Sequence, residues 1–150
     1  MIGVPNFELS EFLVSETAAR QRLNNDPTAE ALANIQHLLA PGMQRVRNLL
    51  GCPVIIISGY RSPAVNRAVG GSENPPSQHM RGQAADFIAP RFGSPLEVAR
   101  QIAANQKTIG FDQLILEGSW THVSFAEIPR GEVLTAHFGP GKTTYTAGLP

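Results

Sequence analysis

A change of hydrophobic periodicity at Gly51 is the feature that most constrains the fold of this chain. Before it, apolar residues recur with a 3.6-residue period from Ala31 to Leu50, which predicts one long amphipathic helix that is kinked at Pro41-Gly42. After it, short β-branched and apolar runs bounded by Gly and Pro predict strands. Helices followed by strands indicate an α+β fold, with N-terminal helices packed on a small, mostly antiparallel sheet.

Caps, turns and apolar runs predict the other elements. Expected helices span residues 10–23, 64–69 and 94–105, and expected strands span 53–57, 84–88, 111–117 and 120–125, with a last strand or hairpin in 132–146. Asp26 is placed to cap the long helix, and Pro27 suits its first turn. The run 53–57 is of the kind that fills a buried central strand. Residues 72–83 form a long polar loop, which a compact domain seldom keeps without a function.

Length and composition exclude several classes of protein. A chain of 150 residues is long enough for one domain, 1–150, and leaves no room for a separate cofactor domain. Its 12 Lys+Arg balance its 12 Asp+Glu, so we expect no nucleic-acid partner. The single cysteine, Cys52, forms no internal disulfide. With no signal-like leader and no long apolar run, we expect a protein that is cytoplasmic at synthesis and does not insert into a membrane. We also expect a monomer.

Two histidines and one aspartate have the chemistry of a catalytic zinc site. His79 lies in the polar loop seven residues before Asp86, which is flanked by Ala85 and Phe87 in an apolar strand. A carboxylate there is costly to bury unless it is paired or coordinates a metal. With His122, this set would leave an open position for water on one tetrahedral Zn²⁺ ion. A capped loop and a satisfied core histidine would explain the same residues without a metal.

The dipeptide Gly118-Ser119 predicts a two-residue type II′ hairpin. Glu117 then pairs with Trp120, and strand alternation puts both on the same face as His122. The opposite, core-facing side takes Leu114, Leu116, Val123 and Phe125. Diagonal neighbours lie about 7–8 Å apart at the backbone, so the Glu117 carboxylate would reach water on a metal held by His122. Glu117 is therefore the candidate general base; a solvated charge at a hairpin tip is the alternative.

Three segments resemble, in order and spacing, the zinc D-Ala-D-Ala carboxypeptidase family. They are SGYRSPAVNRAVGG, SQHMRGQAAD and FDQLILEGSWTHVSF. The similarity runs from Asn6 to about Tyr145 and is greatest to the branch that holds phage endolysins and related bacterial peptidases. The wider clan includes D-Ala-D-Ala dipeptidases and the hedgehog signalling domain fold. The resemblance implies hydrolysis of peptide bonds in peptidoglycan stem peptides, as a carboxypeptidase or an endopeptidase.

The resemblance also implies roles for individual residues. His79, Asp86 and His122 match the zinc ligands, Arg61 matches an arginine that steadies the oxyanion or a substrate carboxylate, and Ser77 matches a substrate-contacting serine. Many members place the catalytic acid three residues before the last histidine, where this chain has Ser119. Among the nearby carboxylates, Glu117 and Asp112, we prefer Glu117 as the general base.

Secondary roles and rival functions follow from the same residues. Trp120 would form the floor of the substrate groove, although packing alone would explain it equally well. Asp112 would orient a ligand histidine, although a cap at the start of a strand is the preferred role. His37 and His137 are expected to be solvated or structural. The rival functions are a zinc-stabilised domain that binds cell-wall peptide or a protein partner without cleaving it, and a structural component of a phage particle. As an endolysin, the protein would act on the cell wall after release by a phage holin or by lysis.

Overall fold

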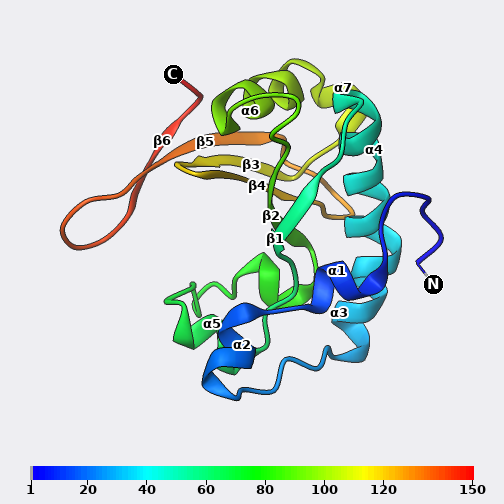
Figure 1. Cartoon of the computed structure of the whole chain (residues 1–150). Coiled ribbons are helices and arrows are strands. Elements are labelled where there is room, and N and C mark those ends of the chain that lie inside the picture. Colours follow the sequence, from blue (N-terminus) through cyan, green and yellow to red (C-terminus); the bar gives the residue numbers. More distant parts are fainter. Residues whose placement is uncertain (1) are drawn as a thin grey trace.

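The computed structural model describes residues 2–150 and shows helices packed on one mixed sheet (Figure 1). The helical elements are α1 (Leu9–Leu13), α2 (Glu16–Gln21), α3 (Ala29–Asn34), η1 (Ile35–Leu39), α4 (Ala40–Leu50), α5 (Pro63–Ala68), η2 (Gln78–Arg81), α6 (Pro95–Ala104) and α7 (Gln106–Ile109). The strands are β1 (Ile55–Ser58), β2 (Ala84–Ile88), β3 (Gln113–Glu117), β4 (Trp120–Ser124), β5 (Glu132–His137) and β6 (Thr144–Ala147). The predicted α+β fold is confirmed.

The sheet is mostly antiparallel, as predicted. Its strand order is β1-β2-β4-β3-β5-β6, and β3 with β5 is the parallel pair among its neighbours. The β5 and β6 strands form the hairpin expected near the end of the chain, and Figure 1 shows its loop reaching away from the rest of the molecule. The sheet therefore extends well beyond the predicted β3–β4 hairpin at its centre.

Two predictions at the N-terminal end are wrong. The helix expected over 10–23 is split into α1 and α2, because the hydroxyl of Ser15 accepts a hydrogen bond from Ala18 N at 3.1 Å and starts a new helix. The next helix is capped by Thr28 rather than Asp26. The Thr28 hydroxyl accepts from the backbone N of Ala31 at 3.1 Å, so the helix begins after Thr28 and not at Pro27.

The long helix is continuous from α3 through η1 to α4, as its periodicity predicts. Its irregularity is a π-helical turn in η1, where the N–H of Ala40 donates to the carbonyl of Ile35, five residues back. Pro41, the residue after Ala40, has no N–H to donate to a carbonyl in the preceding turn. The wider π-helical turn gives its ring the space it needs without ending the helix. Gly42 is buried against the ring of Phe125, which lets helix and sheet approach closely.

The register of the β3–β4 hairpin is the predicted one. Glu117 pairs with Trp120 and Ile115 with His122, and Gly118 takes a φ of 70°, as the first residue of this turn requires. The expectation of a buried central strand over 53–57 is wrong. The strand there, β1, lies at the sheet edge, and the side chain of Ile55 is 50% exposed. An apolar run alone does not show whether a strand has neighbours on both sides.

The two faces of the sheet have different roles. One face packs on α4 and α6, and its buried residues join a core that includes Met43, Phe87, Ile102, Leu114 and Val123. The other face carries Asp86, His122 and Glu117 and is not covered by these helices. Within residues 2–150, none of the helices has the length and apolar character needed to cross a membrane.

Candidate metal centre

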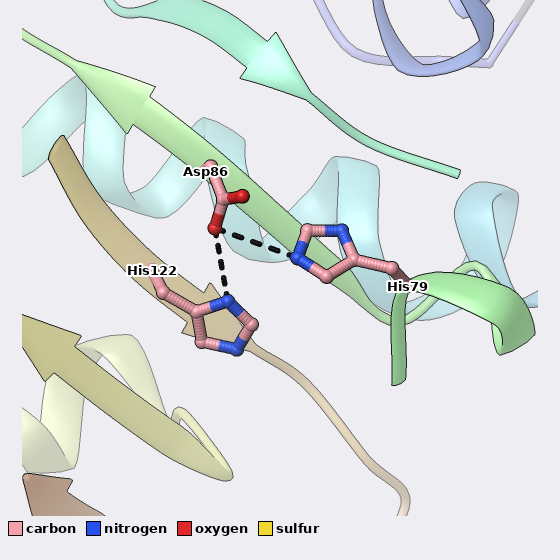
Figure 2. Close-up of side chains that lie close together, drawn as sticks. All are labelled: His79, Asp86 and His122. Carbon is pink, nitrogen blue, oxygen red and sulfur yellow. Dashed lines mark hydrogen bonds and ion pairs between the residues drawn. The ribbon is translucent and has the colours of Figure 1, made fainter. Parts of the chain in front are cut away.

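Two neighbouring strands and one short helix bring His79, Asp86 and His122 together (Figure 2). Asp86 on β2 pairs with His122 on β4, and Asp86 Oδ1 lies 3.0 Å from His122 Nδ1. His79 on η2 places its Nε2 atom 3.4 Å from the same carboxylate oxygen. All three side chains are buried. The structure thus joins a loop residue to two strand residues that lie 36 positions apart.

The spacing and chemistry of these atoms fit a zinc ion. Tetrahedral zinc with bonds of about 2.0–2.1 Å holds neighbouring ligand atoms about 3.3 Å apart. The two distances from Asp86 Oδ1, 3.0 Å to His122 and 3.4 Å to His79, agree with this spacing, and all three ligand atoms lie within 4.8 Å of one another. His79 Nδ1 lies 2.7 Å from the carbonyl oxygen of Gly59. Donation of the Nδ1 proton to this carbonyl leaves the Nε2 lone pair directed at the site. A side chain at Gly59 would meet the backbone of Phe12, so this position requires glycine.

The charges at the site favour a cation. Burial raises the pKa of Asp86, but the positive charge of His79 and hydrogen bonds from His122 and His79 outweigh it, and the pKa lies well below its usual range. Burial lowers the pKa of His79, which favours the neutral imidazole that binds metals. Although burial opposes it, hydrogen bonding to Asp86 raises the pKa of His122. An ionised carboxylate beside a neutral His79 therefore leaves negative charge at this point, which favours a bound cation.

Glu117 lies beside this ligand set at the end of β3. Its Oε1 atom is 3.5 Å from His122 Nδ1, and its side chain is 17% exposed. Burial raises the pKa of Glu117 and the nearby charge of Asp86 raises it further, while His122 opposes them. A carboxylate that touches the ligand set and remains partly accessible is suited to accept a proton from water at the site.

Arg61 and Ser77 lie next to each other on the η2 side of the centre. The backbone N–H of Arg61 donates to the carbonyl of His79 at 3.1 Å, and Arg61 Nη2 donates to Ser77 Oγ at 3.3 Å. Arg61 Nε is buried and has no hydrogen-bond partner within residues 2–150. Burial lowers the pKa of Arg61, whereas the charges of Asp86 and Glu117 raise it. Arg61 thus carries a free donor close to two carboxylates.

The remaining predicted residues divide between the site and its surroundings. Trp120 is half-buried opposite Glu117 on the face of the centre. Asp112 touches no ligand histidine; its carboxylate accepts from Arg130 and from Gln78, which precedes His79. Orienting a ligand histidine, the less favoured of its two predicted roles, is therefore wrong, because the β4–β5 loop and η2 supply its partners.

Two histidines lie away from the centre, as expected. His37 is exposed on the long helix, and His137 is exposed and bonds through Nε2 to the hydroxyl of Thr146 at 2.8 Å. The contacts that sequence reasoning missed are those of Gly59 and Gln78, because both depend on packing between distant segments and no local spacing marks them.

A buried His–Asp–His set beside a glutamate on an open sheet face is the arrangement of a metal-dependent hydrolase. The model of the peptidase M15 family matches residues 5–124, which is most of the chain and includes every residue of the centre. The chain therefore belongs to the peptidase M15 family of zinc-dependent peptidases and is a peptidase of the metalloprotease type. No curated protein sequence matches it. The matched region ends at Ser124, so β5 and β6 lie outside it.

Proposed function

We propose that this protein is a zinc-dependent peptidase that hydrolyses peptide bonds in peptidoglycan stem peptides, with Glu117 as the general base. The observation that carries the proposal is the Glu117 carboxylate 3.5 Å from a ligand atom of a zinc-compatible His–Asp–His set. The helices α4 and α6 pack on the other face of the sheet and do not cover these residues. Membership of the peptidase M15 family supports the reaction class.

The ligand residues and their neighbours have different roles in the proposed reaction. A zinc ion bound to His79, Asp86 and His122 would lower the pKa of water at its open position and polarise the scissile carbonyl. Glu117 accepts the proton of that water and passes it to the leaving amine. Arg61 then stabilises negative charge on the carbonyl oxygen, where a guanidinium in a partly dried site is worth more than in water.

The proposal extends to the biological setting. Similarity to phage endolysins supports a role in cell-wall degradation, in which the enzyme reaches its substrate after release by a holin or by lysis. A monomeric enzyme is sufficient for this chemistry, because all the proposed ligands and the base come from one chain. Size-exclusion chromatography with light scattering tests the monomer.

Mass spectrometry of muropeptides after digestion tests the activity and identifies the cleaved bond. We expect new products from the zinc-loaded protein, a loss of about 10²- to 10⁴-fold in kcat for Glu117→Gln, and loss of stoichiometric zinc in His79→Ala. Glu127→Gln is the matched control, because Glu127 is exposed and is not among the site residues. A zinc-loaded protein that binds muropeptides without cutting them would identify a binding module instead. A Glu117→Gln protein with full zinc and the wild-type rate would remove Glu117 from the mechanism.

A further inference from the structure

The indole N–H of Trp120 is a buried hydrogen-bond donor beside the metal centre. Trp120 begins β4 and shares a sheet face with the ligand His122. Its side chain is half-buried, but Nε1 itself exposes less than 1 Å² and has no hydrogen-bond partner within residues 2–150. Buried polar groups in native proteins are nearly always paired. Because solvent does not reach this N–H, its partner must come from a neighbouring side chain.

The strand register places the Glu117 carboxylate next to this N–H. Glu117 and Trp120 are the directly opposed pair that flanks the Gly118-Ser119 turn. Side chains in such a pair have Cβ atoms about 4.5–5.5 Å apart, a gap that an indole and a glutamate side chain can bridge. On the β2 side, the register sets Ile88 beside Trp120, and an isoleucine side chain has no acceptor. The acceptor next to the indole is therefore Glu117.

The other contacts at the centre leave an oxygen of Glu117 for the indole. Asp86, a second carboxylate on this face, already lies 3.0 Å from His122 Nδ1 and 3.4 Å from His79 Nε2 through one oxygen. Glu117 Oε1 lies 3.5 Å from His122 Nδ1, so Oε2 is the oxygen that remains. Burial raises the pKa of Glu117, whereas His122 and the indole N–H of Trp120 oppose this rise.

A general base at this position needs a partner that fixes its carboxylate. Glu117 is the last residue of β3, at the tip of the hairpin, and a glutamate side chain has several rotatable bonds whose freedom must be removed. Trp120 is a stiff partner, because a tryptophan side chain has only two rotatable bonds. A side chain held by such a neighbour presents its reacting atom in one place.

We propose that Trp120 is a positioning residue, whose indole N–H donates to Oε2 of Glu117 and keeps Oε1 turned toward His122 and the metal position. The proposal rests on the proposed function, because it gives a partner to the general base named there. It differs from the expected role of Trp120 as the floor of a groove, which needs the ring but not the N–H.

Nuclear magnetic resonance tests this hydrogen bond without relying on turnover. The chain holds a single tryptophan, so the indole N–H gives a single resonance in a nitrogen–proton correlation spectrum. In the zinc-loaded protein, we expect this resonance downfield of a free indole and in slow exchange with solvent. Glu117→Ala should move it toward the free-indole position and speed its exchange. Glu127→Ala is the matched control, because Glu127 is exposed. Fast exchange in the wild type, or no response to Glu117→Ala, would overturn the proposal.

Chemical replacement of the tryptophan separates the N–H from the ring. Benzothienylalanine, incorporated in a tryptophan auxotroph, exchanges the N–H for sulfur, and position 120 is the single site that changes. We expect kcat on muropeptides to fall about 3- to 10-fold, while KM and the Kd for zinc change less than about 2-fold.

The same replacement in the Glu117→Ala protein shows whether the N–H acts through Glu117. There it should cause no further fall in kcat, because the partner of the N–H is already absent. An unchanged kcat in the wild-type background, or an equal fall in both backgrounds, would overturn the proposal. If the wild-type protein cleaves no muropeptide, the proposed function fails, and the indole resonance still reports whether Trp120 binds Glu117.

Discussion

Substitution of Asp112 by asparagine should destabilise the protein measurably. Asp112 Oδ1 accepts from Arg130 N at 2.9 Å and Arg130 Nε at 3.0 Å, and Oδ2 accepts from Arg130 Nη2 at 2.7 Å and Gln78 Nε2 at 2.9 Å. An asparagine keeps one oxygen, so its amide nitrogen faces two donors. Each lost hydrogen bond to a charged group is worth about 1.5–3 kcal/mol. Because the Arg130 side chain is 56% exposed, solvent screens its bonds to Asp112 and they contribute less than this.

We therefore expect Asp112→Asn to lower the free energy of unfolding by about 2–3 kcal/mol. For a domain of this size, that corresponds to a fall in Tm of about 4–12 °C, measured by differential scanning calorimetry at pH 7. The control is Glu73→Gln, which breaks the Arg67–Glu73 pair with side chains 69% and 57% exposed and should change the free energy by less than about 0.5 kcal/mol. Equal small shifts in both variants would refute the reasoning.

The same substitution has a defined pH dependence. Hydrogen bonds from Arg130, above all, lower the pKa of Asp112 in the folded protein. A folded pKa below the unfolded value of about 4 means that the stabilisation is complete above this pH and is lost as the pH falls through the folded pKa. The difference in Tm between the wild type and Asp112→Asn should therefore be full at pH 7 and shrink below about pH 4. A difference that grows on acidification would contradict this assignment.

Three further predictions concern the metal centre and the packing around it. Removal of zinc by a chelator should lower the Tm of the wild type, and added zinc should restore it, whereas His79→Ala should not respond. Gly59→Ala should weaken zinc binding about 10- to 100-fold, measured by competition with a chromophoric chelator. The new Cβ would lie 2.5 Å from the carbonyl oxygen of Phe12, so the Gly59 carbonyl that binds His79 would have to shift. Unchanged affinity would show that this carbonyl does not orient His79. Gly42→Ala should lower the free energy of unfolding, measured in urea, by about 1–3 kcal/mol, because its Cβ would meet the ring of Phe125. An unchanged free energy would show that the helix can move away from the sheet at no cost.

Local patterns in the sequence determined much of the fold and the composition of the candidate site. The 3.6-residue period from Ala31 to Leu50 persists through the π-helical turn, because a wide turn shifts the register by one residue without ending the helix. The Gly118-Ser119 turn specified which residues of β3 and β4 pair, and hence that Glu117 shares a face with His122. These are relations between near neighbours in the chain, so sequence spacing encodes them directly.

Other properties depended on which distant segments pack together. The edge position of β1, the carbonyl of Gly59 that binds His79, and the bonds of Asp112 all join segments far apart in the chain. The place of Tyr145 on the face of the metal centre likewise follows from the parallel pairing of β5 with β3. The sequence by itself determined the residue types able to bind zinc and the local turns that carry them. The tertiary structure alone decided their distances and their hydrogen-bond partners, because strand order and long-range packing depend on the whole chain.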